Sequence, residues 1–320
     1  MAPRENGLLR FPRYLSRGMT MKLRGCGTAL VTPFKQDGSV DFAAQRALVE
    51  WQIESGIDFL VPCGTTGETP TLSHDEWLKV IAQTVEVNHG RVPIVAGATS
   101  NNTAEAVEKA KEVAAIKGVD AILTASPYYN KPTQEGQYLH FKAIAEAVDK
   151  PLVLYNVPGR TAANIETATL LRLAKIPNII AVKEASGSLP QIMDVCAQKP
   201  EDFTVLSGDD ALTLPILAVG GVGLVSVASN QIPKELSEMV RAALNNDWAT
   251  ARKLHNHFLA LMNANFLESN PGPVKAVLAM MGRIEENYRL PMVPMRPENR
   301  AKLEKIAAEA GVLKNATVAQ

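Results

Sequence analysis

Short apolar runs alternate with longer amphipathic segments along the chain from about residue 21 onward. Most of the short runs span four to six residues and several are rich in Val and Ile, as is typical of buried parallel strands; they cover residues 27–31, 58–62, 92–96, 121–124, 151–155, 179–183, 204–206 and 222–227. Amphipathic stretches of helical length lie between them, among them 41–55, 73–88, 103–117, 133–148 and 166–174. The pattern therefore predicts eight strands, each followed by a helix.

Local end signals support this assignment at two helices. Ser73 is followed three residues later by Glu76, which is the spacing of a capping box, where each side chain bonds the other residue's backbone N–H. Pro190 stands near the start of the helix that leads to Cys196, where the missing N–H of proline costs little. We expect a helix to begin at each of these places.

Eight strand–helix units with few long linkers are typical of an α/β protein with a (β/α)8 barrel. A doubly wound open sheet is the main alternative, but it usually carries a dinucleotide fingerprint, and no GxGxxG follows the first strand. The last barrel helix is predicted at 233–245, and the residues after it have a helical pattern. We therefore predict a TIM barrel catalytic domain over 21–245 and a small C-terminal helical domain over 246–320.

The composition is that of an ordinary globular protein. Of the 320 residues, 46% are apolar and 21% are charged, and 33 basic residues balance 33 acidic ones. A protein that binds nucleic acid mainly through its phosphates usually has a basic excess, so this class is not expected. No apolar run approaches the roughly 18 residues of a membrane-spanning helix, so no membrane partner is expected either.

The cysteines and the first twenty residues bear on the location of the protein. Cys26, Cys63 and Cys196 are far apart and form no CxxC pair, so they predict neither a disulfide framework nor a zinc site and indicate a reducing, cytoplasmic compartment. Residues 1–20 are rich in arginine and poor in acids. We expect a disordered leader there, and a cleaved organelle-targeting segment is the alternative.

Lys183 is the most informative residue for chemistry. Active sites of (β/α)8 barrels lie at the C-terminal ends of the strands, and Lys183 ends the sixth apolar run within IIAVKEASG. If its side chain points inward, desolvation favours the neutral amine and lowers its pKa, which makes a lysine nucleophilic toward carbonyls. The alternative is a structural ion pair with Glu184, although adjacent strand residues face opposite sides of a sheet.

Other strand ends contribute hydroxyl and cationic groups. The second strand runs into CGTTGET at 63–69, where small residues leave backbone N–H groups open to an anion such as a carboxylate. The fourth ends in SPYYNKP with Tyr128 and Tyr129, and the fifth ends in LYNVPGRT with Tyr155 and Arg160. A phenol can relay protons and an arginine can hold a carboxylate bidentately. With the strand lysine, these groups predict Schiff-base chemistry on a small oxoacid, with no cofactor and no catalytic metal.

The motifs at the strand ends resemble those of a known enzyme family. They are GTTGE (64–68), PYYN (127–130), YNVPGRT (155–161), VKEASG (182–187), SGDD (207–210) and NPGPVK (270–275). From about residue 21 to its end, the chain resembles the dihydrodipicolinate synthase (4-hydroxy-tetrahydrodipicolinate synthase) family. This family belongs to the pyruvate-dependent class I aldolase superfamily, which also contains N-acetylneuraminate lyase. GTTGE and the strand lysine mark the superfamily, and PYYN with YNVPGRT narrows it to the synthase branch.

The resemblance implies a role for each matching residue. Lys183 would be the lysine that forms the Schiff base with pyruvate. Tyr155 would relay protons with the help of Thr65 and of Tyr129, the latter donated by a neighbouring subunit. Thr66 and its backbone would hold the pyruvate carboxylate. A tyrosine donated between subunits implies at least a dimer, and the family resemblance implies a homotetramer built as a dimer of dimers.

The resemblance also implies the substrates. Arg160 would bind the carboxylate of the second substrate, and Gly208 and Val225 would line the pyruvate pocket, where the family often has isoleucine in place of the valine. The implied activity is that of a lyase that condenses pyruvate with L-aspartate 4-semialdehyde, giving 4-hydroxy-tetrahydrodipicolinate in lysine (diaminopimelate) biosynthesis.

Two other functions stay open at this point. One is another pyruvate-dependent Schiff-base aldolase or dehydratase that acts on a keto-deoxy sugar acid. Arg160 makes this function less favoured, because an enzyme for a polyol substrate would be expected to have neutral hydroxyl-binding groups at that position. The other is a non-enzymatic binding or scaffold protein, for which we would expect the lysine or the relay hydroxyls to be lost.

Overall fold

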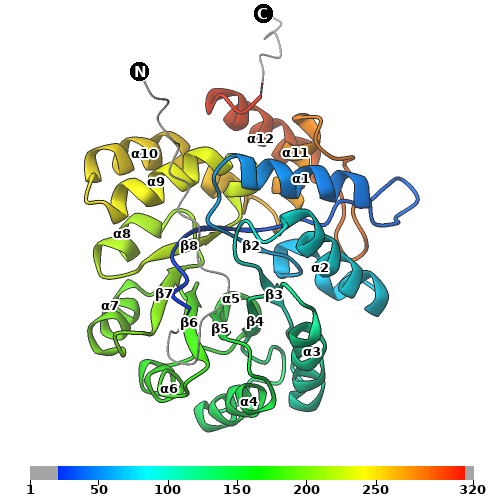
Figure 1. Cartoon of the computed structure of the whole chain (residues 1–320). Helices are drawn as coiled ribbons and strands as arrows, with labels where there is room; N and C mark the ends of the chain where they lie inside the picture. Colours follow the sequence, from blue (N-terminus) through cyan, green and yellow to red (C-terminus); the bar gives the residue numbers. More distant parts are fainter. Residues whose placement is uncertain (1–20, 314–320) are drawn as a thin grey trace, which may run out of the picture.

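The structure, a computed structural model, describes residues 21–313. Eight parallel strands form one sheet that curls into a barrel, with helices packed around its outside (Figure 1). The predicted (β/α)8 fold is therefore confirmed. The predicted leader at 1–20 lies outside the described residues.

The strands follow one another around the barrel in chain order. They are β1 (Gly25–Ala29), β2 (Phe59–Val61), β3 (Val95–Gly97), β4 (Ala121–Ala125), β5 (Leu152–Asn156), β6 (Ile179–Glu184), β7 (Thr204–Ser207) and β8 (Gly223–Ser226). Parallel ladders run from β2 through β1 and β8 and on around to β3. A parallel bridge between Leu60 and Ile94 brings β3 back to β2 and closes the ring.

Helices connect the strands and cover the outer face of the sheet (Figure 1). Up to residue 245 they are α1 (Phe42–Glu54), α2 (His74–Asn88), α3 (Thr103–Ala115), α4 (Gln134–Ala147), α5 (Pro158–Thr161), α6 (Thr167–Leu173), α7 (Leu189–Gln198), α8 (Thr213–Ala218) and α9 (Pro233–Leu244). Three short 3-10 helices, η1 (Thr65–Gly67), η2 (Thr69–Thr71) and η3 (Ala228–Asn230), follow β2 and β8. The one-turn helix α5 was not predicted, and it carries Arg160.

The two predicted helix starts are confirmed. Glu76 N donates to Ser73 Oγ at 3.2 Å and Ser73 N donates to the Glu76 carboxylate at 2.9 Å, so α2 begins with a complete capping box. Helix α7 begins at Leu189, with Ser188 as its N-cap and Pro190 in its first turn. Both starts depend on contacts within four residues, which the sequence carries locally.

Every strand departs from its predicted bounds by at least one residue, and β1 and β3 depart the most. In these two, an asparagine side chain bonds the backbone where the strand was predicted to continue. Strand β1 ends at Ala29, short of the predicted Val31. Asn230 Nδ2 donates to Ala29 O at 2.8 Å, and Val31 N donates to Asn230 Oδ1 at 3.1 Å. Strand β3 begins after Val92, since the Asn88 side chain bonds both backbone groups of that residue. In both cases a side chain replaces the ladder that the apolar pattern alone would predict.

Alternating residues of the strands pack into two apolar layers. One layer fills the barrel and includes Ala29, Val61, Leu123, Val153, Tyr155, Leu206 and Val225. The other lies between the sheet and the surrounding helices and includes Ile122, Leu152, Leu154, Val182 and Val205. Because neighbouring strand residues alternate between the layers, the barrel interior is a packed core that opens toward a site only at the strand ends.

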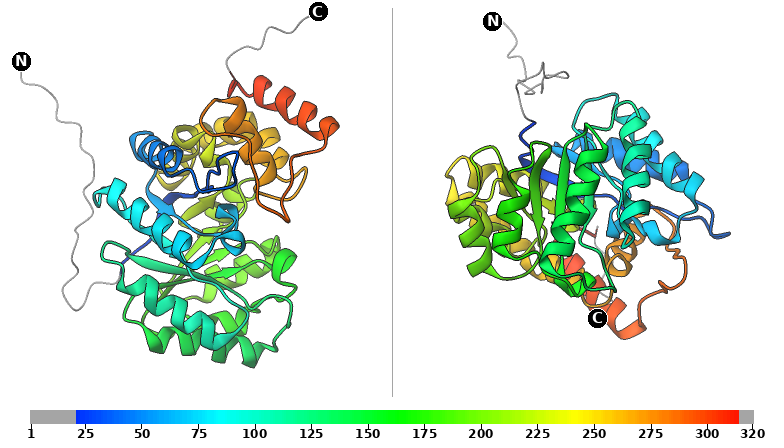
Figure 2. Two further views of the ribbon diagram at one scale, coloured as in Figure 1. Left: turned by 90° about the vertical axis from the view of Figure 1, so that its right-hand side faces the viewer. Right: turned by 90° about the horizontal axis from the view of Figure 1, so that it is seen from below.

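Three further helices follow the barrel and gather on one side of it (Figures 1 and 2). They are α10 (Trp248–Ala264), α11 (Gly272–Met280) and α12 (Pro297–Glu309). One apolar cluster includes Leu236 of α9, Phe258 and Leu261 of α10 and Leu303 of α12. The domain boundary after residue 245 stays a prediction, since this cluster runs across it. Between residues 21 and 313, no helix combines the length and the apolar character needed to cross a bilayer.

Candidate active site

Lys183 and Tyr155 are neighbours on adjacent strands. In the ladder between β5 and β6, Tyr155 pairs with Lys183, and the next residues, Asn156 and Glu184, pair with each other. The Lys183 Nζ lies 4.2 Å from the centroid of the Tyr155 ring. The two side chains thus meet at the C-terminal ends of their strands, where barrel enzymes hold their active sites.

The Lys183 amine is buried without a directly paired carboxylate. Only 5% of the residue is exposed, and this burial lowers the pKa of Lys183 to about 7; the charge of Asp210 opposes the shift and that of Arg160 adds to it. A lysine in water has a pKa of about 10.4. A large fraction of Lys183 is therefore the neutral amine at physiological pH, which is the nucleophilic form.

Glu184 faces the other side of the sheet from Lys183. Its carboxylate accepts a hydrogen bond from Asn156 Nδ2 at 3.1 Å and one from Ser186 N at 2.7 Å. Burial raises the pKa of Glu184, and these hydrogen bonds oppose the shift. The chain therefore does not form the alternative Lys183–Glu184 ion pair. Instead, the Asn156–Glu184 contact joins the same two strands directly behind the Tyr155–Lys183 pair.

Tyr155 connects the lysine to the turn after β2. Burial raises the pKa of Tyr155 to about 12, while the charge of Arg160 and a side-chain hydrogen bond with Thr65 oppose this shift. The phenol consequently keeps its proton near neutral pH. Lys183, Tyr155 and Thr65 form a row of exchangeable groups through which a proton can move.

The turn formed by η1 is held by residues far away in the sequence. Thr32 Oγ1 donates to Gly67 O at 2.7 Å, and Asn270 Nδ2 donates to Thr66 Oγ1 at 3.0 Å. A threonine hydroxyl has one proton and two acceptor lone pairs. Because the Asn270 amide uses an acceptor position, the Thr66 hydroxyl keeps its proton for donation to another group.

Arg160 stands at the edge of this arrangement. It lies on α5 and is exposed, and its Nη2 donates to Asn270 O at 3.4 Å. A guanidinium carries five N–H donors, so this contact leaves others for a bound carboxylate. Asn270 therefore touches both groups that the resemblance assigns to substrate carboxylates, Arg160 and Thr66.

Gly208 adjoins the lysine, and Val225 lies in the interior layer of the barrel. Gly208 follows β7, and its N–H donates to Glu184 O at 2.8 Å. A methyl group on Gly208 would stand 2.9 Å from Ala185 Cβ and 3.1 Å from Lys183 Cγ. Val225 on β8 is buried in the same interior layer as Tyr155. Any side chain larger than hydrogen at 208 would press on the stem of the lysine.

We expect Gly208→Ala to slow pyruvate adduct formation on Lys183 by about 10- to 100-fold, because a shift of the amine by a fraction of an ångström spoils its approach to the carbonyl. The measurement is the rate at which borohydride traps the adduct. Gly272→Ala is the matched control, since the nearest atom to its new methyl, apart from its chain neighbours and the backbone of its own helix, is Met292 Cε at 4.0 Å. An unchanged trapping rate in Gly208→Ala would show that the lysine does not need this space.

Tyr129 is not packed into the site of its own chain. It stands on the loop after β4 with 88% of its surface exposed and with a positive φ of 73°. Asn101 and Asn130 fasten the loop, because Asn130 Nδ2 donates to Asn101 O at 2.9 Å and Asn101 Nδ2 donates to Tyr128 O at 3.1 Å. An aromatic residue in the left-handed region is unusual and persists only where its surroundings impose it. The loop thus presents the Tyr129 phenol to the outside.

Sequence reasoning gave no role to Asp210 or to Asn270. Asp210 is buried and accepts hydrogen bonds from Ser226 Oγ at 2.5 Å and from the N–H groups of Val227 and Ala228. Its charge partly opposes the lowering of the Lys183 pKa by burial. Two adjacent acids in SGDD at a barrel strand end were an available signal for it. Asn270 stands 204 residues from Thr66, and nothing in the local pattern joins the two.

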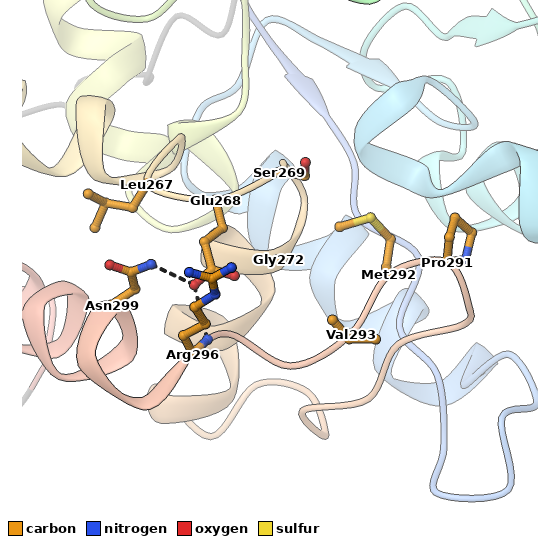
Figure 3. A pocket seen from close by; sticks show the side chains of 9 residues that line it. All are labelled: Leu267, Glu268, Ser269, Gly272, Pro291, Met292, Val293, Arg296 and Asn299. Carbon is orange, nitrogen blue, oxygen red and sulfur yellow. Dashed lines mark hydrogen bonds between the residues drawn. The ribbon is translucent and has the colours of Figure 1, made fainter.

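Metal binding and a nearby surface pocket also bear on what these residues can do. Within 21–313, no group of three or more His, Cys, Asp and Glu residues is placed to hold a metal ion. A pocket of about 420 Å³ lies between the chain before α11 and the start of α12 (Figure 3). There the Glu268 carboxylate accepts from Arg296 N at 3.0 Å and from Asn299 Nδ2 at 2.8 Å. The pocket borders the segment around Asn270 but includes none of the predicted site residues.

Comparison with known proteins supports the resemblance drawn from the strand-end motifs. The model of the dihydrodipicolinate synthetase family matches residues 22–310. The chain belongs to this family. The resemblance drawn from the sequence motifs is therefore confirmed.

Relatives in this family share one enzymatic name. The 4-hydroxy-tetrahydrodipicolinate synthase of Acidobacterium capsulatum is 60% identical over 301 residues, which are 94% of this chain and 100% of the relative. The synthase of Nitratidesulfovibrio vulgaris (strain Miyazaki F) is 53% identical over 294 residues, or 92% and 100% of the two chains. The chain is accordingly an enzyme, a lyase of the class I aldolase type.

Solved structures of the family share the fold. Dihydrodipicolinate synthase from Aquifex aeolicus superposes with a TM-score of 0.89 at 43% identity, covering 92% of this chain and 100% of that one. The enzyme from Acinetobacter baumannii, solved in complex with pyruvate, gives 0.89 at 43% identity over 91% and 99% of the chains. The similarity therefore extends over the barrel and the helices that follow it.

Proposed function

We propose that the protein condenses pyruvate with L-aspartate 4-semialdehyde through a Schiff base on Lys183, giving 4-hydroxy-tetrahydrodipicolinate for lysine (diaminopimelate) biosynthesis. The observation that carries the proposal is the buried amine of Lys183, with a pKa of about 7, against the Tyr155 ring. The names of the relatives and the pyruvate held by the A. baumannii enzyme support the choice of substrates.

The first half of the reaction forms the imine. The neutral Lys183 Nζ attacks the ketone carbon of pyruvate and gives a carbinolamine. Its hydroxyl leaves as water after taking a proton from the Tyr155 phenol, which the Thr65 hydroxyl then helps to reprotonate. The Thr66 hydroxyl, whose acceptor position is taken by Asn270, donates to the pyruvate carboxylate. Splitting the condensation through this covalent intermediate replaces one difficult step by easier ones.

The second half forms the carbon–carbon bond and releases the enzyme. Loss of a proton from the pyruvate methyl group gives an enamine, and its carbon attacks the aldehyde of aspartate semialdehyde. Arg160 holds the carboxylate of that substrate with its remaining guanidinium donors. The substrate amine then attacks the imine carbon and displaces Lys183 as the ring closes, which returns the free lysine.

We further propose that the enzyme acts as a cytoplasmic homotetramer, arranged as a dimer of dimers. The support is Tyr129, an aromatic side chain that is 88% exposed on a fastened loop and would complete the proton relay of a second copy. Free cysteines at 26, 63 and 196 are consistent with a reducing compartment.

Borohydride reduction in the presence of pyruvate tests the proposal. The expected product is a chain with one added reduced pyruvate on Lys183, located by peptide mass analysis. Condensation with aspartate semialdehyde is compared with cleavage of sugar-derived oxoacids in the same preparation. A chain that binds no pyruvate at Lys183 would refute the Schiff base, and preferred cleavage of a sugar acid would refute the substrate pair.

A further inference from the structure

A fully buried ion pair joins the turn of the site to helix α11. Lys275 Nζ lies 2.6 Å from Glu68 Oε1, and the two side chains are 0% and 1% exposed. Glu68 directly follows η1, the turn that carries Thr65 and Thr66, whereas Lys275 stands 207 residues later in the chain. Neither residue takes part in the reaction steps proposed above.

Aromatic rings hold the ammonium group of Lys275 in place. Its Nζ lies 4.3 Å from the centroid of the Phe34 ring and 5.1 Å from that of the Tyr288 ring. Ring faces attract a cation, most strongly where water is excluded. Burial lowers the pKa of Lys275 and raises that of Glu68, and each partner opposes the shift of the other. The position of the Lys275 head group is therefore set from three sides.

The backbone of Glu68 forms the end of the η1 turn. Its conformation is left-handed, with φ 52° and ψ 33°. Glu68 N donates to Thr65 O at 3.1 Å, and Glu68 O accepts from Thr71 N at 2.9 Å. A residue with a side chain adopts this conformation only where surrounding contacts impose it. The side-chain contact that fixes Glu68 consequently also fixes where the turn ends.

A buried ion pair is a weak explanation of stability by itself. Removing two charges from water often costs more free energy than their mutual attraction returns. Proteins in which apolar residues of similar volume replace such a pair are frequently as stable. Here the pair lies beside a turn that must present hydroxyl and N–H groups with defined geometry. The same segment of the chain also reaches that turn a second time, through the hydrogen bond from Asn270 to Thr66.

We propose that Glu68 and Lys275 are positioning residues for pyruvate recognition. Their contact fixes the turn so that Thr65 and Thr66 face the substrate carboxylate and the Tyr155 phenol at the right distance. The inference rests on the proposed function, in which this turn binds pyruvate. It assigns to α11, outside the eight strands, a part in substrate affinity.

Three variants test the inference: Lys275→Met, Glu68→Gln and the double variant Glu68→Gln/Lys275→Met. For each, the amount of borohydride-trapped adduct on Lys183 is measured against pyruvate concentration, and thermal unfolding is recorded alongside. We expect Lys275→Met to raise the half-saturating pyruvate concentration about tenfold, while the adduct at saturation stays near the wild-type amount.

The double variant separates positioning from stability and from charge. It contains no unpaired buried charge, so we expect its unfolding temperature to return close to that of the wild type. Its half-saturating pyruvate concentration should nevertheless stay at least about fivefold raised, because the turn has lost its anchor. Wild-type pyruvate affinity in the double variant would overturn the inference. If the variants without Lys275 do not fold, the Glu68→Gln variant tests the inference by itself. Its half-saturating pyruvate concentration is expected to rise about threefold, and an unchanged value would overturn the inference equally.

A matched control uses a lysine of the same region whose ion pair is exposed. Lys305 Nζ lies 3.9 Å from Glu309 Oε1, with 77% and 65% of the side chains exposed. Lys305→Met makes the same chemical change and should leave the pyruvate dependence unaltered. Failure of the wild-type protein to form any pyruvate adduct would contradict the proposed function, whereas a wild-type response of the double variant contradicts only the positioning role.

Discussion

Lys183→Met is expected to abolish the pyruvate adduct and to lower the rate of condensation by at least about 10⁴-fold. Methionine has a similar length but no amine, so no covalent intermediate can form. The measurements are mass analysis after borohydride treatment and the steady-state rate with both substrates. Residual activity within about tenfold of the wild type would mean that another group carries the reaction.

The stability of the same variant serves as its control. Lys183 has a pKa of about 7 in the folded protein and a higher one in the unfolded chain. The folded state is therefore penalised at neutral pH, where the unfolded chain binds the proton more tightly. Lys183→Met removes this cost and should unfold at a higher temperature than the wild type. A variant that is inactive but more stable has lost chemistry and has kept its fold.

The pH dependence of adduct formation follows from the same pKa. With a pKa of about 7, the neutral amine of Lys183 increases as the pH rises through 7 and is nearly complete above about pH 8. An ordinary lysine would continue to gain reactivity up to pH 10 and beyond. Single-turnover trapping at saturating pyruvate between pH 5.5 and pH 9.5 distinguishes the two. A rate that still climbs steeply at pH 9 would mean that burial does not tune this amine.

Arg160→Ala is expected to lower kcat/KM for aspartate semialdehyde by about 100- to 1000-fold, since a bidentate contact to a carboxylate is lost. Pyruvate adduct formation should persist, because Lys183 and Tyr155 remain. The Arg160 charge helps to lower the pKa of Lys183, so the variant should need a somewhat higher pH for the same adduct rate. Assays at pH 8.5 therefore compare the two proteins fairly.

Arg160→Lys is the informative companion variant. It retains the positive charge but presents no planar pair of donors, so it should recover the pH profile of adduct formation while recovering little of the affinity for aspartate semialdehyde. Loss of the pyruvate adduct in Arg160→Ala at pH 8.5 would contradict the role proposed for this residue. It would mean that Arg160 serves the first substrate.

The parts of the fold that the sequence predicted well are those with local causes. The eight strands follow from short apolar runs, and the capping box of α2 follows from Ser73 and Glu76, three residues apart. The strand ends were less certain. Ala29 ends β1 because of Asn230, and that contact spans 201 residues. An apolar pattern within a window of ten residues holds no information about such a partner.

The candidate site also contains residues that local motifs predicted and residues whose placement depends on distant parts of the chain. Lys183, Tyr155 and Thr65 stand at strand ends in recognisable motifs, and the barrel topology brings them together. Tyr129 is predicted to complete the relay of a neighbouring subunit, and this stays a prediction, because the single chain shows only that the residue is exposed. The burial of Lys275 against Glu68 could not be foreseen, because a lysine on a helix is usually a solvated side chain.

The contacts that the η1 turn makes with distant parts of the chain affect the order in which the enzyme folds. Thr66 and Glu68 bond partners 204 and 207 residues further along the chain. Closing so long a loop costs entropy before the contact returns any free energy. We expect the turn to reach its final geometry late in folding, after the strands around it have paired. A nascent chain released with its first eight strands alone would thus hold every reacting group proposed here and still lack the final geometry of the η1 turn.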